Sequence, residues 1–356
     1  MLFATENHHD NYALPAEWAP QSAVQLTWPH ENSDWNYCLD AITQTFVELV
    51  RAIVPFEPVL IVTPNVEQTR ARLMADLSAD LLTDLKFVQA ASNDTWARDH
   101  ALITLQGKNG NLFLNFCFNG WGEKFPSDLD NAINRRVFEA GILDGRMEEH
   151  ADFVLEGGAI ESDGKGTVFT TSQCLLAPRR NQPLGQKEIE QKLKEFLRAD
   201  RIVWLDYGNL TGDDTDGHID TIVRCAPDDT LVYVGCENPD DEQYHDFQML
   251  KKQLEDLQTT SGKAYRLLEL PMPEPIFDEE GNRLPATYAN FLIVNNAVIC
   301  PTYNQPTLDR QALEVIAEAF PNRKIIPLDA RTIILQHGSI HCLTMQFPAG
   351  AFTKNN

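Results

Sequence analysis

The sequence predicts an α/β fold in which strands and helices alternate through one domain, residues 1–356. Three observations support this prediction. No linker rich in Pro, Gly or Ser divides the chain, and hydrophobic residues make up 43% of it, which is enough to fill a large core. Short apolar runs alternate with longer segments whose apolar residues recur every three or four positions.

The predicted elements follow from these two patterns. The apolar runs predict strands at Ala23–Thr27, Pro58–Val62, Asn111–Phe116, Thr167–Thr171, Thr230–Val234 and Phe291–Val294. The longer periodic segments predict helices at Asn36–Ile53, Val66–Leu77, Gln186–Leu197, Gln243–Leu257 and Leu308–Phe320. The last helix is expected to begin after Thr307, with Asp309 in its first turn.

Clusters of polar and aromatic residues lie at the ends of several strands. Asp99, Glu156, His218 and Cys342 belong to four of these clusters and are separated by about 60 residues or twice that length. Such spacing indicates a repeated strand–helix unit, although chance among chosen landmarks also explains it. Five such units could close into a ring, and the clusters would then meet at its axis.

The charge of the chain excludes several partners. Lys and Arg number 29 and Asp and Glu 52, which gives a net charge of −23. A chain this acidic is poorly suited to bind nucleic acid or an anionic membrane through charge. No apolar stretch is long enough to span a membrane. Seven widely spaced cysteines and an N-terminus without the features of a signal peptide predict a cytoplasmic protein with free thiols.

No common motif for a metal or a nucleotide occurs in the chain. HExxH, HxH, GxxxxGK[ST] and a strand-borne GxGxxG are all absent. The sequence therefore predicts neither a metal nor another cofactor. It leaves the oligomeric state open, and a homo-oligomer is compatible with it.

Cys342 is the candidate nucleophile. It follows Gly338 and Ser339, which predict a tight turn that could place the thiol at the mouth of an element. An ordinary thiol has a pKa of about 8.5, so Cys342 would need a neighbouring cation to become a thiolate at neutral pH. The alternative is a buried structural cysteine.

Four residues could assist such a nucleophile. His218 could protonate a leaving group and then activate water, and Asp220 would share its face if both lie on a strand. Asp99 could hold a planar cation by charge-assisted hydrogen bonds. Glu156 ends an apolar run, where a carboxylate must be protonated or paired, for example with a histidine. The alternatives are an Asp-rich surface loop, an Arg98–Asp99 surface pair and a solvated strand-end glutamate.

These residue types match the needs of guanidinium hydrolysis. A guanidinium is planar and stays protonated, and resonance deactivates its carbon. Its hydrolysis needs a strong nucleophile, carboxylates that hold the cation in place and a proton donor for the departing ammonia. The candidates above supply all three.

Motifs along nearly the whole chain resemble the agmatine deiminase family, part of the bacterial-type peptidylarginine deiminase group of guanidine-modifying enzymes. In order, they are Pro15–Trp18, Thr27–His30, Trp96–Asp99, Asn119–Gly122, Glu156–Gly158, Gly217–Asp220 and Ile340–Cys342. The resemblance implies a single guanidine-modifying domain with a five-bladed, pseudo-fivefold α/β propeller of the pentein type and an active site at its axis. It also implies a small cationic guanidino substrate and no cofactor.

The resemblance further implies a mechanism. Cys342 attacks the guanidinium carbon, His218 protonates the departing ammonia, and water then releases a ureido product from an amidino-cysteine. Asp99 and Asp220 grip the guanidinium, and Glu156 supports His218 and the substrate. Agmatine would yield N-carbamoylputrescine and ammonia.

For the distal end of the substrate we expect Asp214, together with Asp213 or Asp216, to meet the primary ammonium. Trp96 or Trp121 would line the aliphatic chain or cover the cation, with core packing as the alternative for both. Three other activities stay open: a deiminase of peptidyl or free arginine, a binding protein without catalysis, and a papain-like cysteine protease. The intact set of catalytic residue types argues against the binder, and the paired carboxylates argue against the protease.

Overall fold

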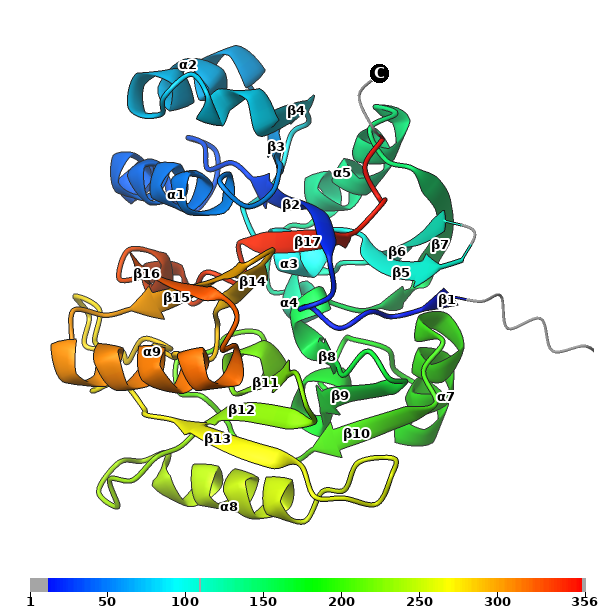
Figure 1. Ribbon diagram of the computed structural model, residues 1–356, viewed down its shortest axis with the longest axis vertical. Helices are drawn as coiled ribbons and strands as arrows, with labels where there is room; N and C mark the ends of the chain where they lie inside the picture. The colour runs from blue at the N-terminus through cyan, green and yellow to red at the C-terminus, as the bar shows by residue number, and fades with distance from the viewer. Residues whose placement is uncertain (1–11, 109, 354–356) are drawn as a thin grey trace, which may run out of the picture.

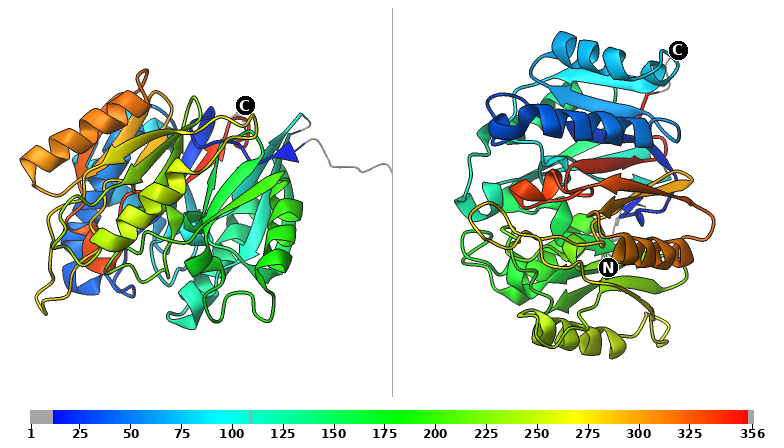
Figure 2. Two further views of the ribbon diagram at one scale, coloured as in Figure 1. Left: turned by 90° about the horizontal axis from the view of Figure 1, so that it is seen from below. Right: turned by 90° about the vertical axis from the view of Figure 1, so that its left-hand side faces the viewer.

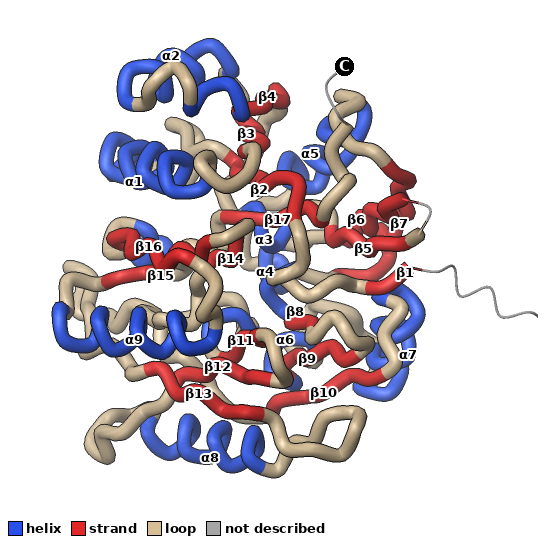
Figure 3. Tube along the Cα trace, viewed as in Figure 1, coloured by secondary structure: helices blue, strands red, loops and turns tan. Residues whose placement is uncertain are grey.

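The computed structural model describes residues 12–108 and 110–353, which form five small sheets. The long helices lie at the periphery, and the strands lie between them and the centre (Figure 1). The turned views keep these helices on the outside (Figure 2), and colouring by secondary structure shows the same division (Figure 3). The predicted α/β class is confirmed.

Four of the sheets share one plan. An antiparallel hairpin is followed by a helix and by a third strand that pairs in parallel with the second strand of the hairpin. The units are β5 (Ile103–Gly107), β6 (Gly110–Cys117), α5 (Asp128–Glu139) and β7 (Gly145–Val154); β8 (Ile160–Ser162), β9 (Thr167–Thr171), α7 (Gln186–Leu197) and β10 (Arg201–Leu205); β11 (Val223–Ala226), β12 (Thr230–Val234), α8 (Tyr244–Glu255) and β13 (Arg266–Leu270); β14 (Leu292–Val294), β15 (Ala297–Thr302), α9 (Pro306–Ala319) and β16 (Lys324–Asp329). The structure thus contains the repeated strand–helix unit that the spacing indicated.

The fifth sheet joins the two ends of the described chain. Its hairpin-like pair is formed by the last strand and the second, which run antiparallel, and two further strands extend it in parallel. In spatial order the strands are β17 (Thr344–Pro348), β2 (Gln21–Thr27), β3 (Val59–Thr63) and β4 (Leu85–Gln89), with α1 (Leu39–Ile53) and α2 (Val66–Asp76) as connections. The short strand β1 (Tyr12–Ala13) pairs with β5.

Helix α1 shows why apolar spacing predicted the long helices. Its buried positions include Ile42, Phe46, Leu49, Val50 and Ile53, which recur every three or four residues and share one face. This face enters the main hydrophobic core. Each large aliphatic side chain buried there contributes about 1.5–3 kcal/mol.

The predicted start of the last helix is wrong. Helix α9 begins at Pro306, with Gln305 as its N-cap, rather than after Thr307. Proline suits the first turn because its fixed φ matches the helix and its missing N–H has no partner to lose. Asp309 accepts hydrogen bonds from the backbone N–H groups of Gln305 (2.9 Å) and Tyr303 (3.0 Å), which fixes the entry of the chain.

Helix α5 was not predicted, because its inward face is half polar. Asp130 and Asn134 are buried beside Ile133 and Val137. Asp130 accepts from the backbone N–H of Asn93 at 2.7 Å, and such local partners allow polar groups inside. Apolar periodicity therefore gives a weak signal for this helix.

The predicted lack of a signal peptide concerns residues 1–11, which lie outside the described residues. Within the described part of the chain, no helix is long and apolar enough to cross a membrane. All seven cysteines carry free thiols.

Candidate active site

Five side chains selected from the sequence lie together near the centre, although their segments are far apart in the chain. Each belongs to a turn or to a single helical turn that borders a strand. They are Asp99 in α3 (Ala97–His100), Glu156 before η3 (Gly157–Ala159), His218 before η4 (Ile219–Thr221), Asp220 within η4, and Cys342 before β17. None is more than 4% exposed.

Gly158 allows three of these groups to converge. A Cβ at this position would lie 2.6 Å from Nδ1 of His218, 2.9 Å from Oδ1 of Asp99 and 3.1 Å from Oδ2 of Asp220. Real Cβ atoms rarely come so close to other atoms, so the site requires glycine here. The backbone N–H of Gly158 also donates a hydrogen bond to Oδ1 of Asp99, at 3.1 Å.

The Cys342 thiol lies beside the same carboxylates. Its sulfur is 3.8 Å from Oδ2 of Asp220 and 3.4 Å from Oδ1 of Asn290. Burial raises the pKa of the thiol well above its ordinary value, and the charges of Asp220 and Asp99 raise it further. The free site therefore holds a neutral thiol, and a bound cation would favour the thiolate.

His218 is placed to carry a proton. Burial alone would lower the pKa of its imidazole, but the carboxylate of Asp99 and the thiol of Cys174 outweigh burial and hold the pKa well above its ordinary value. Nδ1 of His218 is 3.6 Å from Oδ1 of Asp99, so the attraction acts without a short hydrogen bond. At neutral pH the imidazole is therefore protonated and can act as an acid.

Asp99 is oriented by Trp121. Burial raises the pKa of Asp99 to about 6, while the indole N–H of Trp121, 3.0 Å from Oδ2, helps to keep the carboxylate ionised. Trp121 has a φ of 54°, in the left-handed region that is rare for a bulky residue, within α4 (Gly120–Glu123). Phe118 and Phe125 pack edge-on against its ring. The structure thus gives Trp121 a partner that the sequence did not predict.

His341 fixes Asp220 from the opposite side. Nδ1 of His341 lies 2.6 Å from Oδ2 of Asp220, and Nε2 lies 2.9 and 3.0 Å from the two oxygens of Glu17. Because ionised carboxylates only accept hydrogen bonds, His341 donates on both sides. Burial would raise the pKa of Asp220, but the hydrogen bond and charge of His341 bring it below its ordinary value.

Two buried arginines hold Glu17 in turn. Nη1 of Arg98 donates to Oε1 of Glu17 at 2.9 Å, and Nη2 of Arg224 donates to Oε2. Arg224 also binds Glu161 and two backbone carbonyls. Burial would raise the pKa of Glu17, but the positive charges of His341, Arg98 and Arg224 bring it well below its ordinary value.

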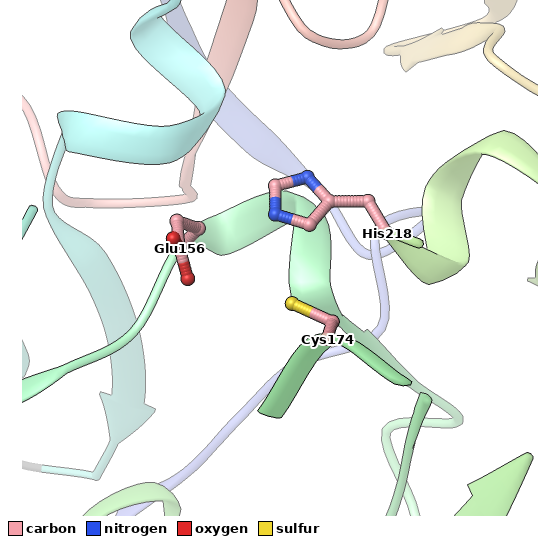
Figure 4. Close-up of side chains that lie close together, drawn as sticks. All are labelled: Glu156, Cys174 and His218. Carbon is pink, nitrogen blue, oxygen red and sulfur yellow. The ribbon is translucent and has the colours of Figure 1, made fainter. Parts of the chain in front are cut away.

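Glu156 forms an ion pair with Arg180. Nε of Arg180 donates to Oε1 of Glu156 at 2.8 Å, and both side chains are fully buried. Glu156 was expected to be protonated or paired with a histidine, and the structure pairs it instead with Arg180, which was not a predicted site residue. On its other side Glu156 faces Cys174 and His218, and a potential ligand atom of each lies within 4.8 Å of the others (Figure 4).

The expected strand at His218 and Asp220 is wrong. The two residues lie at the start of η4, a single 3₁₀ turn, which follows Gly217 with a φ of 92°. A 3₁₀ turn has about three residues per turn, so residues two apart point to different sides of it. The side chains still meet because both pack against Gly158.

The residues expected at the distal end of the substrate lie in one loop. Asp214 is half-buried, and burial raises the pKa of its carboxyl. Asp216 is already paired with Arg180 (2.7 Å) and Lys124 (2.8 Å). Asp213 accepts hydrogen bonds within its own loop, including one of 2.7 Å from the backbone N–H of Gly217. Their engagement leaves Asp214 as the stronger candidate of the three.

Trp96 packs as a core residue does. It is 5% exposed, and its ring centroid lies 5.8 Å from that of Trp35. A Cβ on Gly338 would come within 2.2 Å of the Trp96 ring, so this ring occupies the space beside the loop that leads to Cys342. A role in lining the substrate stays a prediction for both Trp96 and Trp121.

Four further residues of this centre were not predicted: Cys174, Arg180, Asn290 and His341. Two of them carried a signal. Asn290 is a polar residue directly before the predicted strand Phe291–Val294, and His341 directly precedes Cys342 in a motif. Cys174 and Arg180 carried no such signal. Most cysteines are buried structural thiols and most arginines lie on the surface, so neither residue stands out in the sequence as part of a site.

Comparisons with known proteins agree with this geometry. The family described as Porphyromonas-type peptidyl-arginine deiminase matches residues 13–348. Agmatine deiminase from Pseudomonas syringae pv. tomato is 33% identical over 365 residues, covering 96% of each chain. A structure from Porphyromonas gingivalis, provisionally named an arginine deiminase, is 45% identical with a TM-score of 0.90, covering 96% of this chain and 100% of that one.

A cysteine-to-serine variant of C. jejuni agmatine deiminase, solved with substrate bound, is 38% identical with a TM-score of 0.87 and covers 95% of this chain and 96% of that one. Its fold is therefore shared over nearly the whole length. The match of the family over almost all of the described residues leads to one conclusion: this chain belongs to the Porphyromonas-type peptidyl-arginine deiminase family.

Proposed function

We propose that this chain is an agmatine deiminase, a hydrolase that converts agmatine to N-carbamoylputrescine and ammonia. The observation that carries the proposal is the buried thiol of Cys342 beside the carboxylates of Asp99 and Asp220, with His218 across Gly158. Relatives named agmatine deiminase, one of them solved with substrate, support the choice of agmatine.

The first chemical step is attack by sulfur. Asp99 and Asp220 bind the guanidinium edge and hold its plane beside Cys342. The added positive charge lowers the pKa of the thiol, which gives its proton to solvent and, as a thiolate, attacks the guanidinium carbon. His218 gives its proton to the departing nitrogen, ammonia leaves, and an amidino-cysteine remains.

The second step reverses the role of His218. Its neutral imidazole accepts a proton from water, which attacks the amidino carbon, and collapse of the adduct releases the ureido product and the Cys342 thiolate. Glu156 and Asp99 keep the imidazole in place through their negative charges. At the distal end, Asp214 meets the primary ammonium, and Trp96 or Trp121 lines the aliphatic chain.

The proposal extends to architecture and setting. The five sheets form the blades of a pseudo-fivefold α/β propeller of the pentein type, with Cys342 at the axis and residues 1–356 as a single catalytic domain. The shared plan of four sheets supports this arrangement. Seven free thiols favour a cytoplasmic location, and a net charge of −23 favours a small cation over nucleic acid. The proposal includes a homo-oligomer as its assembly.

A panel of guanidino compounds tests the function. Ammonia and ureido product are measured with agmatine, free arginine and an arginine-containing peptide, for the wild-type chain and for Cys342→Ala. We expect kcat/KM for agmatine to exceed the others by at least about tenfold, and Cys342→Ala to lose at least about 10⁴-fold in kcat, as expected for a nucleophile. Cys300→Ala, a change at another buried thiol, is the control and should keep full turnover.

Deimination of arginine is the second candidate. It is favoured by the 45% identical structure named for arginine and by the family description. Both activities use the same sulfur, imidazole and carboxylates, so they differ only at the distal end. A higher kcat/KM for arginine or the peptide would replace agmatine and leave the chemical mechanism unchanged.

A further inference from the structure

Within residues 12–108 and 110–353, two groups of three side chains could hold a cation. One comprises Glu156, Cys174 and His218, and the other comprises Glu17, Glu161 and His341. The sequence has no local metal motif because each group is drawn from separate segments. Their surroundings differ, and this difference decides which group can accept an ion.

The second group is already filled by protein cations. Arg98 and Arg224 donate to Glu17, and Arg224 also donates to Glu161. Both ring nitrogens of His341 are hydrogen-bonded. A metal ion would have to displace these bonds.

The first group keeps its donor atoms free. Oε2 of Glu156 and both ring nitrogens of His218 are buried without a hydrogen-bond partner among the described residues. Arg180 occupies only Oε1 of Glu156. Figure 4 shows the sulfur of Cys174, the carboxylate of Glu156 and the His218 ring gathered from three segments.

Donor chemistry and size then select the ion. Thiolate, imidazole and carboxylate are the ligands of Zn²⁺, with bonds of about 2.0–2.3 Å that place neighbouring donors about 3.5 Å apart. The three ligand atoms lie within 4.8 Å of one another. Side-chain rotations that move the donor atoms by about 1 Å would bring them to the separation that zinc requires. A water molecule would take the fourth position, as in other three-ligand zinc sites.

We propose that Glu156, Cys174 and His218 form a binding site for a zinc-class divalent cation that regulates the enzyme by taking His218 out of catalysis. Binding displaces the thiol proton of Cys174 and one ring proton of the protonated His218, and a metal-bound imidazole can no longer alternate between acid and base. The inhibition rests on the proposed function, whereas the binding does not. Cys342 is a separate thiol and belongs to neither group.

Binding is tested with Co²⁺ as a spectroscopic substitute for Zn²⁺, added to the chelator-treated full chain. A thiolate-to-cobalt charge-transfer band that saturates at one equivalent is expected for the wild type, Cys342→Ser and the control Cys300→Ser, and should be absent from Cys174→Ser. Near-ultraviolet circular dichroism of Cys174→Ser and Cys174→Ala is used to identify the folded variant, on which the result is then scored. Three results would each overturn the site. The band could be absent from the wild type, it could persist in a folded Cys174 variant, or it could be lost in Cys342→Ser.

Inhibition is tested separately. Zn²⁺ should suppress ammonia release from agmatine by the wild type and by Cys300→Ser, and the inhibition constant should rise at least tenfold in the Cys174 variants. An unchanged constant would overturn the regulatory role. If the metal-free chain releases no ammonia from any guanidino compound, the proposed function fails, while the cobalt band still decides the site.

Discussion

Two clusters of buried charge lie side by side in this molecule and differ in how completely their polar atoms are paired. The support cluster consists of Glu17, Arg98, Glu161, Arg224 and His341, and none of its side-chain nitrogen or oxygen atoms lacks a partner among the described residues. The reaction cluster consists of Asp99, Glu156, Cys174, His218 and Cys342. In this second cluster, Oε2 of Glu156 and both nitrogens of His218 have no hydrogen-bond partner within residues 12–108 and 110–353. Asp220 touches both clusters.

The comparison separates rigidity from reactivity. A buried ion that is fully paired fixes its neighbours, and removing one partner leaves a charge without compensation. A buried group without a partner costs stability but stays available to a ligand. The support cluster therefore positions Asp220, while the reaction cluster holds its atoms ready for the substrate.

The pKa of one carboxyl group in each cluster is shifted, and the two shifts have opposite directions. The pKa of Glu17 lies well below its ordinary value, so its ionisation favours the folded state above pH 4.5, and this stability is lost as the pH falls through the folded pKa. The pKa of Asp99 is raised to about 6, so its ionisation opposes folding as the pH rises toward 6.

The largest expected effect is on the support cluster. Arg224→Met keeps the unbranched stem of a fully buried side chain but removes the cation between Glu17 and Glu161. We expect the free energy of unfolding to fall by about 3–5 kcal/mol at pH 7, measured by urea denaturation.

Arg310→Met is the matched control, since Arg310 is exposed and lies 4.0 Å from Glu314. This control should change stability by less than about 0.5 kcal/mol. An Arg224→Met variant as stable as the control would show that the support cluster does not stabilise the fold.

The next prediction reverses the sign within the reaction cluster. Asp99→Asn cannot ionise, so at pH 7 it should be more stable than the wild type by about 1–3 kcal/mol, although it loses turnover. The gain should disappear by about pH 4, where Asp99 itself is protonated. Unfolding curves at several pH values give this difference.

Asp220→Asn sharpens the same comparison. The pKa of Asp220 is lowered by His341, so its charge stabilises the folded state above pH 3.8, and the amide should reduce stability at pH 7. The two neighbouring aspartates should thus respond with opposite signs. Equal signs would remove the distinction between the clusters.

The sequence predicted the reaction cluster better than the support cluster, for a physical reason. The nucleophile, the acid and the carboxylates lie in motifs near the ends of strands that match a known chemistry, so Cys342, His218, Asp99 and Asp220 could be selected. Glu17 lies in a motif that was recognised, but its task depends on Arg224, more than 200 residues away. No local pattern reports such a pairing.

The fold shows the same limit. Helix α7, which has one apolar face, was predicted with its observed bounds, and α1 was predicted within three residues, because burial alone determines their pattern. Helix α5 and the 3₁₀ turn at Asp220 were not, because Asn134 and Asp220 are buried through polar partners brought by other segments. The spacing of apolar residues predicts which side chains face the core, but it does not predict which polar side chains meet partners from distant segments.

The smallest effect concerns a single hydrogen bond at the edge of the reaction cluster. Trp121→Phe keeps the ring packing against Phe118 but removes the N–H that donates to Asp99. A lost bond to a carboxylate raises its pKa, so the acid limb of the kcat/KM profile, which reports free Asp99, should move upward by about one pH unit. Trp35→Phe also loses an indole hydrogen bond, but to Thr95, so its acid limb should stay in place. If both variants shift the limb equally, the effect is general loosening, and the Trp121–Asp99 bond does not tune the site.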